Sequence, residues 1–152
     1  MHELDRLFNP RSVAVVGAKQ IDNYNWLRNV LEFQGPKYNV NIDEREWAGA
    51  AELGFPNYKS LMDIPGEVDF VIVSVPAVIV PRILADCIAK KVYGVHLYTA
   101  GFGETRTEDG IRLEGEVVKM AREANIKLVG PNCLGIFNPK LGLGFPTSGY
   151  AG

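Results

Sequence analysis

The chain has 152 residues, of which 47% are hydrophobic and 22% are charged, and its formal net charge is −2. This length suits one domain with its own core, and the composition excludes disordered and fibrous classes. The charge pattern has no basic blocks to support a nucleic-acid partner, and no apolar run is long enough to span a bilayer. The 2 cysteines make no disulfide framework. Residues 1–6 show no signal-peptide core, so we expect a cytoplasmic protein.

The segment Ser12–Gly17 predicts the first strand of the fold. Its apolar residues are consecutive and mostly β-branched, which suits a strand covered on both faces, as in a parallel sheet. Gly17 then ends the run where a tight turn needs a residue without a Cβ atom. Apolar residues at helical spacing predict a helix over residues 25–32, with Asn25 as its N-cap. Strand, glycine turn and helix form the first half of a mononucleotide-binding βαβ unit.

The rest of the chain alternates in the same way between short apolar runs and helical patterns. Further strands are predicted over residues 38–42, 68–75, 94–99 and 126–129. Helices are predicted over 79–88 and 107–124, a helical turn over 60–65, and a loop anchored by Trp47 over 43–51. Leu7 and Phe8 are expected to pack against the core. We expect residues 1–152 to form one domain, with 136–152 as a covering segment or the lead into a following domain of a longer chain.

This alternation predicts an α/β, Rossmann-like fold with a mostly parallel sheet and helices on both faces. In such a sheet the carboxyl ends of the strands meet at one edge, where open α/β sheets bind their ligands. Four turn-forming segments fall there, namely 17–18, 75–76, 99–101 and 130–133. Together they favour a nucleotide-like ligand more strongly than Gly17 does alone, because a single glycine is a weak motif.

His96 and Cys133 belong to residue types that often act in catalysis, but their sequence context favours a structural role for both. His96 lies inside an apolar run, where a core histidine is the more frequent outcome than a ligand. Cys133 follows Asn132 in a polar turn, and no histidine base pairs with it in the sequence. We therefore predict no catalytic residue, and the absence of a CxxC pair or a histidine cluster gives no support to a metal site.

The turns at this edge resemble the N-terminal CoA-binding domain of NDP-forming acyl-CoA synthetases. That family includes ADP-forming acetyl-CoA synthetase and, more distantly, the succinyl-CoA synthetase alpha subunit. The resemblance covers nearly the whole chain, in order, and its most specific part is the segment 130–135. It rests on the segments Leu7–Ala18, Val75–Ala77, Ala100–Glu104 and Gly130–Gly135.

The resemblance implies that CoA binds across this edge. It assigns the phosphates to the turn after the first strand (Gly17, Ala18, Lys19 and Gln20) and the adenosine to the end of the second (Val40 and Asn41). The later turns would flank CoA through Val75, Pro76, Ala77, Ala100, Gly101, Phe102 and Glu104. Asn132 and Cys133 would lie near the pantetheine end, where the thiol is presented to an acyl phosphate.

The resemblance also implies partners. In the family, phosphate passes through a histidine of a following domain, and a separate ATP-grasp portion holds the nucleotide. Neither His2 nor His96 matches that histidine. We therefore expect the chain to act with a phosphohistidine domain and an ATP-grasp domain, and not to complete a ligase cycle alone.

The turn after the first strand departs from the family pattern. The family usually carries one or two more glycines there, whereas this chain continues with residues 19–25, which include Asp22 and Tyr24. A charge and a bulky ring replace the close backbone approach that glycine allows. Ile42 stands where the family has proline. These changes leave the fold untouched and are expected to weaken CoA binding.

Two other functions remain open. An NAD(P)-binding oxidoreductase domain would need a fuller glycine fingerprint and an acidic residue at the end of the second strand, where Asn41 stands and Asp43 follows two residues later. A non-catalytic module whose nucleotide site has decayed would explain Asp22 and Tyr24 in the phosphate turn.

Overall fold

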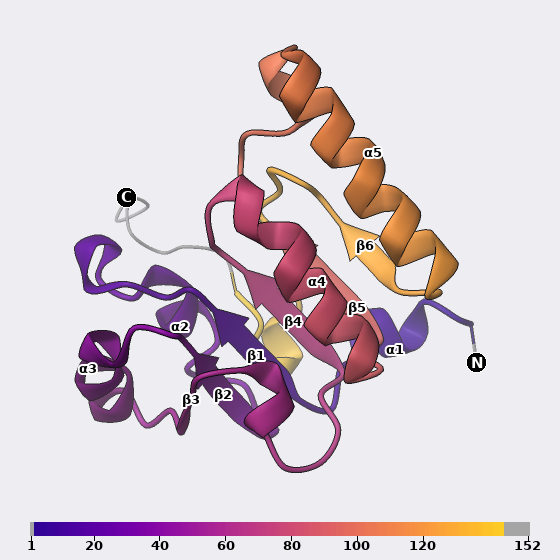
Figure 1. The fold of residues 1–152 in the computed structure, drawn as a ribbon. Coiled ribbons are helices and arrows are strands. Elements are labelled where there is room, and N and C mark those ends of the chain that lie inside the picture. The colour runs from indigo at the N-terminus through magenta and orange to yellow at the C-terminus, as the bar shows by residue number, and fades with distance from the viewer. Residues whose placement is uncertain (1, 145–152) are drawn as a thin grey trace, which may run out of the picture.

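The computed structural model describes residues 2–144 and contains one six-stranded sheet, with the strand order β3-β2-β1-β4-β5-β6 (Figure 1). Every pairing is parallel. The strands are β1 (Val13–Val16), β2 (Lys37–Val40), β3 (Asn57–Tyr58), β4 (Phe70–Val73), β5 (Gly94–Leu97) and β6 (Lys127–Val129). The order reverses between β1 and β4, and this is the switch point at which doubly wound sheets bind ligands.

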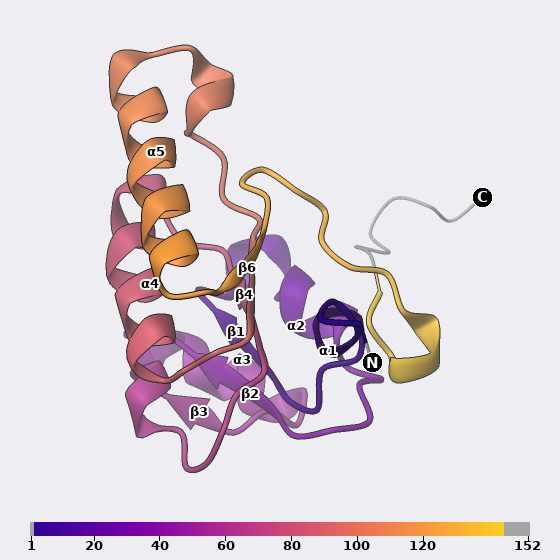
Figure 2. The same ribbon diagram turned by 90° about the vertical axis from the view of Figure 1, so that its right-hand side faces the viewer.

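Helices cover both faces of the sheet, which confirms the predicted fold class. Figure 2 shows α4 and α5 on one side of the sheet, and α1 and α2 on the other. The α-helices are α1 (Asp5–Phe8), α2 (Asn25–Asn29), α3 (Trp47–Glu52), α4 (Val80–Ala89) and α5 (Glu108–Glu123). Short 3₁₀ turns are η1 (Gln20–Asp22), η2 (Glu44–Glu46), η3 (Leu61–Asp63), η4 (Ala77–Ile79), η5 (Gly103–Thr105) and η6 (Pro139–Leu141).

The central strand β1 separates two hydrophobic cores. Ala14 and Val16 belong to the core beneath α4 and α5, whereas Val13 and Val15 belong to the core on the α1 and α2 side. All four side chains are buried because successive residues of a strand point to opposite faces and both faces are covered. The uninterrupted apolar run was therefore a sufficient signal for the central strand.

Three predictions about the first helical segments are wrong. Asn25 is the first residue of α2 and not its N-cap, because Tyr24 occupies the N-cap position in the left-handed region (φ 52°) and makes no capping hydrogen bond with its side chain. The helix also ends at Asn29, earlier than predicted. Leu7 is buried as expected, but Phe8 is 46% exposed. Helix α1 is too short to turn both residues inward.

Residues 43–51, predicted as a loop, fold into η2 and α3. The Asp43 carboxylate accepts a hydrogen bond from the Arg45 backbone N–H and so caps η2. Trp47 begins α3, and its indole N–H donates to the Asn41 carbonyl oxygen over 2.9 Å. The aromatic anchor was therefore correct, while Gly49, a residue that disfavours helix interiors, concealed the helix.

The long helix α5 follows its prediction closely, and the segment after β6 covers the α2 side of the sheet. Thr107 caps α5 through its hydroxyl, which accepts from the Gly110 N–H over 3.0 Å. Leu143 is buried, and the Gly144 N–H donates to the Asn29 carbonyl oxygen. Residues 136–144 thus form the expected covering segment. The rest of the predicted tail, 145–152, lies outside the described residues.

Candidate functional site

The turns at the carboxyl ends of the strands are tied to one another across the sheet. A Cβ atom on Gly17 would lie 2.3 Å from the Ser74 carbonyl oxygen, so the turn after β1 touches the turn after β4. The Thr99 hydroxyl, after β5, donates to the Val75 carbonyl oxygen over 2.6 Å. The Asn132 N–H, after β6, in turn donates to the Thr99 carbonyl oxygen. The predicted segments therefore share one edge, which we call the ligand edge.

The predicted site residues differ in how far they are exposed at this edge. Lys19, Gln20, Pro76, Ala100, Glu104 and Asn132 are exposed. Gly17, Val75, Ala77, Gly101 and Cys133 are half-buried. Ala18, Val40, Asn41 and Phe102 are buried, and the Phe102 side chain is fully buried in the core beneath α4 and α5. Of these four residues, Val40 and Asn41 line the pocket described below.

The turn after β1 directs a backbone N–H towards an anionic oxygen. Gly17 adopts a φ of 92°, and the Ser74 carbonyl leaves no room for a side chain there. Beyond it, the Gln20 N–H donates to a carboxylate oxygen of Glu46 over 2.9 Å. Glu46 comes from η2, so the chain supplies its own anion to the turn that the resemblance assigns to the CoA phosphates. An amide that binds a carboxylate oxygen also suits a phosphate oxygen.

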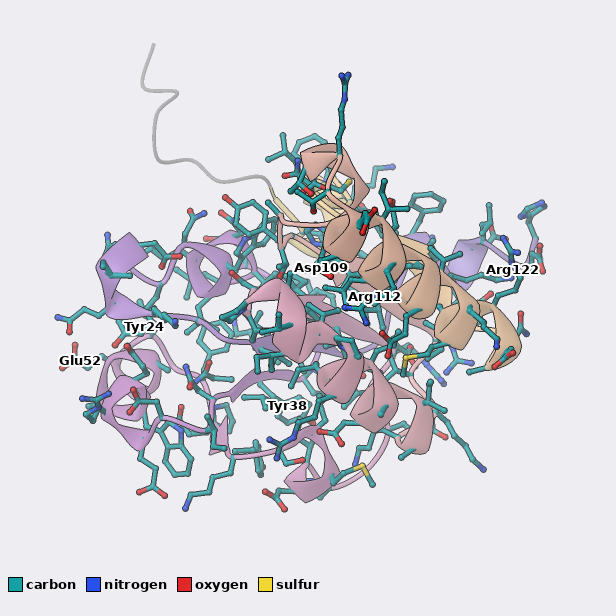
Figure 3. The ribbon with its side chains drawn as sticks, turned by 45° about the horizontal axis from the view of Figure 1, so that its top comes forward. Tyr24, Tyr38, Glu52, Asp109, Arg112 and Arg122 are labelled. Carbon is teal, nitrogen blue, oxygen red and sulfur yellow. The ribbon has the colours of Figure 1, made fainter. Side chains whose placement is uncertain are left out.

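Tyr24 holds this turn against α3 (Figure 3). Its side chain is 7% exposed, and a Cβ atom on Gly49 would lie 2.2 Å from the Tyr24 hydroxyl oxygen. Burial raises the pKa of Tyr24, and the Glu46 carboxylate raises it further. Tyr24 therefore packs as a structural residue and does not fill the space in front of the turn.

Asn41 braces the turns after β1 and β2. Its Nδ2 donates to the Ala18 carbonyl oxygen over 2.8 Å, and its Oδ1 accepts from the Asp43 N–H over 2.9 Å. Both polar ends of this buried amide are thus used within the protein. Asn41 therefore fixes the shape of the ligand edge, with one of its two Nδ2 hydrogens and its Oδ1 both bonded to the protein backbone.

Glu104 stabilises the turn after β5. Its carboxylate accepts from the Gly101 N–H over 2.5 Å and from the Phe102 N–H over 3.1 Å. The hydrogen bond from Gly101 is the main reason why the pKa of Glu104 is lowered. The carboxylate is therefore held as an anion by its own turn.

The turn after β6 places Cys133 next to His96, but without catalytic geometry. The His96 Nε2 lies 2.5 Å from the Cys133 carbonyl oxygen, not from its thiol. The His96 ring packs edge-on against Trp26 with a centroid distance of 4.9 Å, and its side chain is fully buried. Burial lowers the pKa of His96, so the imidazole is neutral. The core interpretation of His96 is confirmed.

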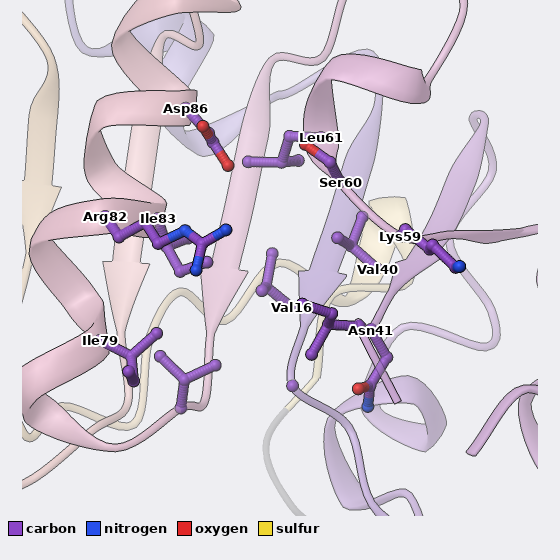
Figure 4. A pocket seen from close by; sticks show the side chains of 13 residues that line it. Val16, Val40, Asn41, Lys59, Ser60, Leu61, Ile79, Arg82, Ile83 and Asp86 are labelled. Carbon is purple, nitrogen blue, oxygen red and sulfur yellow. The ribbon is translucent and has the colours of Figure 1, made fainter. Parts of the chain in front are cut away.

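A pocket of about 150 Å³ opens beside Gly17 at the switch point (Figure 4). The carboxyl ends of β1 and β2, the turn after β4, the start of η3, and η4 with the first turns of α4 line it. Among its lining residues, Gly17, Val40, Asn41 and Val75 were predicted from the sequence. Ile42 was noted only as a departure from the family pattern, and the sequence did not predict Lys59, Ser60, Ile79, Arg82, Ile83 and Asp86. Ile79 and Ile83 lie at the start of the helix predicted over 79–88, and the start of that helix at the ligand edge was the available signal.

The two cations of this pocket have different surroundings. The Lys59 ammonium lies 2.6 Å from a Glu44 carboxylate oxygen, and this contact raises the pKa of Lys59. The Arg82 guanidinium has no hydrogen-bond or ion-pair partner within residues 2–144. Arg82 is therefore the unpaired cation of the pocket.

Two other kinds of site find no support in the part of the chain that the structure describes. No helix there is long and apolar enough to cross a membrane. Between residues 2 and 144, no group of three or more His, Cys, Asp or Glu side chains is placed to hold a metal ion.

A doubly wound parallel sheet, a glycine turn after β1 and a pocket at the switch point together define a Rossmann-like nucleotide-binding domain. Comparison with known proteins narrows this class: the family described as CoA binding domain matches residues 11–139. The chain belongs to this family.

Similar proteins agree with this membership. The chain is 45% identical over 139 residues to the ADP-forming acetate–CoA ligase II subunit alpha of Pyrococcus furiosus, covering 89% of the chain and 29% of that protein. It is 41% identical to the ADP-forming acetate–CoA ligase I of Archaeoglobus fulgidus, covering 92% of the chain and 20% of that protein.

A solved structure shows the same fold. The dinucleotide-forming acetyl-coenzyme A synthetase 1 of Ca. Korarchaeum cryptofilum, in complex with phosphate and ADP, is 32% identical, with a TM-score of 0.82. The match covers 96% of this chain and 31% of that one. The chain thus spans less than a third of the length of each of these three proteins.

Proposed function

We propose that this chain is the CoA-binding domain of an ADP-forming acyl-CoA synthetase and presents the CoA thiol to an acyl phosphate. The observation that carries the proposal is the turn after β1, where Gly17 lets the turn after β4 pack closely and the Gln20 N–H already binds an anionic oxygen. Family membership and the ADP-forming ligases among the relatives support the same reading.

The residues at the ligand edge fit the parts of CoA. The pyrophosphate suits the Gln20 N–H, and the apolar pocket walls Ile42, Ile79 and Ile83 suit a flat heteroaromatic ring such as adenine. This pocket is too small for the whole ligand. The pantetheine arm would follow the edge towards the exposed Asn132 and the half-buried Cys133. CoA supplies the acyl-accepting thiol, while the chain binds and orients it.

We further propose that the remaining chemistry belongs to other parts of a longer synthetase. The relatives are three or more times as long as this chain, and one of them is a subunit. Under this proposal residues 1–152 form one CoA-binding domain. A phosphohistidine domain and an ATP-grasp domain, on the same chain or another, would form and hold the acyl phosphate.

Calorimetric titration of the chain with CoA, with NAD and ATP as comparison ligands, tests the proposal. We expect saturable heat with CoA and weaker or no heat with NAD, because no acidic side chain is free at the end of β2 to bind ribose hydroxyls. The Asp43 carboxylate there is already paired with Arg45 at 2.8 Å. Absence of heat with millimolar CoA would contradict the proposal, and preference for NAD would favour an oxidoreductase domain.

One contact favours the second candidate, a module that has lost its nucleotide site. Glu46 occupies the Gln20 N–H, so a phosphate has to displace a carboxylate before it can bind. If the wild-type chain ignores CoA and Glu46→Gln binds it, the site is intact but blocked. If neither binds CoA, the decayed module is the better description. Glycine replacement of Tyr24 would be a poorer test, because that side chain is buried against Gly49.

A further inference from the structure

CoA carries a phosphate on the 3′-hydroxyl of its ribose, which NAD and ATP lack. Among the residues that the structure describes, the pocket at the ligand edge contains one cation without a partner, the Arg82 guanidinium. This inference rests on the proposed function. We propose that Arg82 binds the ribose 3′-phosphate and makes the domain select CoA over 3′-dephospho-CoA.

Arg82 lies where its side chain can reach a ligand at the ligand edge. Arg82 lies in the first turn of α4, which begins at Val80 next to the ligand edge. Figure 4 shows its side chain extending from α4 across the pocket towards the strand ends, while the Lys59 ammonium points away from the pocket. A guanidinium at this place can reach a group on a ribose held between the pocket and the turn after β1.

Arg82 is also the cation of this pocket that is available for a second phosphate. A 3′-phosphate needs its own cation, because the pyrophosphate takes the Gln20 N–H. Lys59 is paired with Glu44, which leaves Arg82 as the pocket cation without a partner in the described part of the chain. An arginine also matches a phosphate geometrically, since it offers parallel N–H donors to two oxygens.

Asp86 defines where the phosphate can lie. It lines the same pocket one helical turn further along α4, so its carboxylate repels a phosphate placed deeper along the helix. It forms no ion pair with Arg82 in the structure. The two charges therefore favour a phosphate at the Arg82 end of the pocket, which is the end nearer to the turn after β1.

The experiment is a cycle of two ligands and two proteins. CoA and 3′-dephospho-CoA are titrated calorimetrically into the wild-type chain and into Arg82→Gln. We expect the wild type to prefer CoA about tenfold, as one charge-assisted contact would give, and Arg82→Gln to bind both ligands equally. The affinity for 3′-dephospho-CoA should be the same in both proteins, which also shows that the variant is folded.

Two variants serve as controls. Arg122→Gln removes an exposed arginine at the far end of α5, whose side chain has no hydrogen-bond or ion-pair partner between residues 2 and 144, and it should keep the tenfold preference (Figure 3). Arg82→Lys keeps the charge but loses the paired donors, so it should keep part of the preference.

The outcomes separate this inference from the proposed function. If the wild type binds CoA and 3′-dephospho-CoA equally, the role of Arg82 is overturned while CoA binding stands. If Arg82→Gln retains the tenfold preference, another residue binds the 3′-phosphate, and the inference is also overturned. If the wild type binds neither ligand at millimolar concentration, both the inference and the proposed function fail.

Discussion

A single carboxylate decides whether the turn after β1 is free for a ligand. The Gln20 N–H is the donor that a phosphate would use, and Glu46 approaches it from a helix 26 residues further along the chain. Gln20 and Glu46 do not belong to a common sequence motif. Their contact exists only because Trp47 and Tyr24 hold η2 and α3 against this turn.

Glu46→Gln is expected to strengthen CoA binding about fivefold, because it removes a negative charge from the place where the pyrophosphate binds. Calorimetry measures the change. Glu52→Gln, on the outer part of α3, removes the same charge without touching Gln20 and should change the affinity little. An equal gain from both variants would mean that net charge, and not the Glu46 contact, controls binding.

Gly17→Ala is expected to abolish CoA binding and to lower the free energy of unfolding by at least about 2 kcal/mol. The new Cβ atom would lie 2.3 Å from the Ser74 carbonyl oxygen, at a φ of 92°. Gly66→Ala is the matched control, since Gly66 has a φ of 82° but nothing within 4 Å of a Cβ atom. Urea denaturation should therefore show a smaller loss for Gly66→Ala, and equal losses would contradict the close contact at Gly17.

At the scale of elements, a buried carboxylate joins the N-terminal segment to the sheet. Asp69 precedes β4 and is 2% exposed. It accepts from the Arg6 guanidinium over 2.7 Å and from the Arg11 backbone N–H over 2.9 Å. Burial opposes the charged form, but these donors outweigh it, so the pKa of Asp69 is lowered. Helix α1 is too short to be stable alone and depends on this contact.

Asp69→Asn is expected to lower the free energy of unfolding by about 1.5–3 kcal/mol near pH 7, since charge-assisted hydrogen bonds are lost. Because the folded pKa lies below the unfolded one, this stabilisation is complete above about pH 4 and is lost as the pH falls through the folded pKa. Thermal unfolding of both proteins from pH 7 to pH 3 measures the difference. A difference that did not shrink at the acidic end would rule out the ionised carboxylate as its source.

At the scale of the whole molecule, the segment 136–144 closes the core on the α1 and α2 side. Figure 2 shows it outside α1 and α2, on the face opposite α4 and α5. Leu143 is 3% exposed, and the Asn138 side chain donates to the Phe8 carbonyl oxygen over 2.8 Å. The two ends of the described chain are thereby joined, so a truncation before residue 136 would expose apolar surface.

Leu143→Ala is expected to lower the free energy of unfolding by about 2–3 kcal/mol without changing CoA affinity, because the cavity forms away from the ligand edge. Urea denaturation and calorimetry check the two parts. Leu134→Ala is the control, since Leu134 is 58% exposed and its truncation should cost little. A loss of CoA affinity in Leu143→Ala would show that the covering segment also shapes the site.

The amino-acid sequence by itself determined the fold class, the central strands and the positions of the turns at the ligand edge. These features depend on local patterns: four consecutive buried residues in β1, the cap at Thr107, and the alternation of short strands with helices. The sequence also supported the family resemblance, which the comparisons confirmed.

Only the tertiary structure decided how that edge is occupied. The contact of Glu46 with Gln20 and the brace at Asn41 join segments that are distant in the chain, and Arg82 is left unpaired because no such segment brings it a partner within residues 2–144. No periodicity or spacing encodes such pairs, because each depends on where a neighbouring element directs a side chain. The same is true of Phe102, whose side chain lies in the core and not towards a ligand. The sequence could not decide between these two positions, because the outcome depends on the helix that packs above this residue.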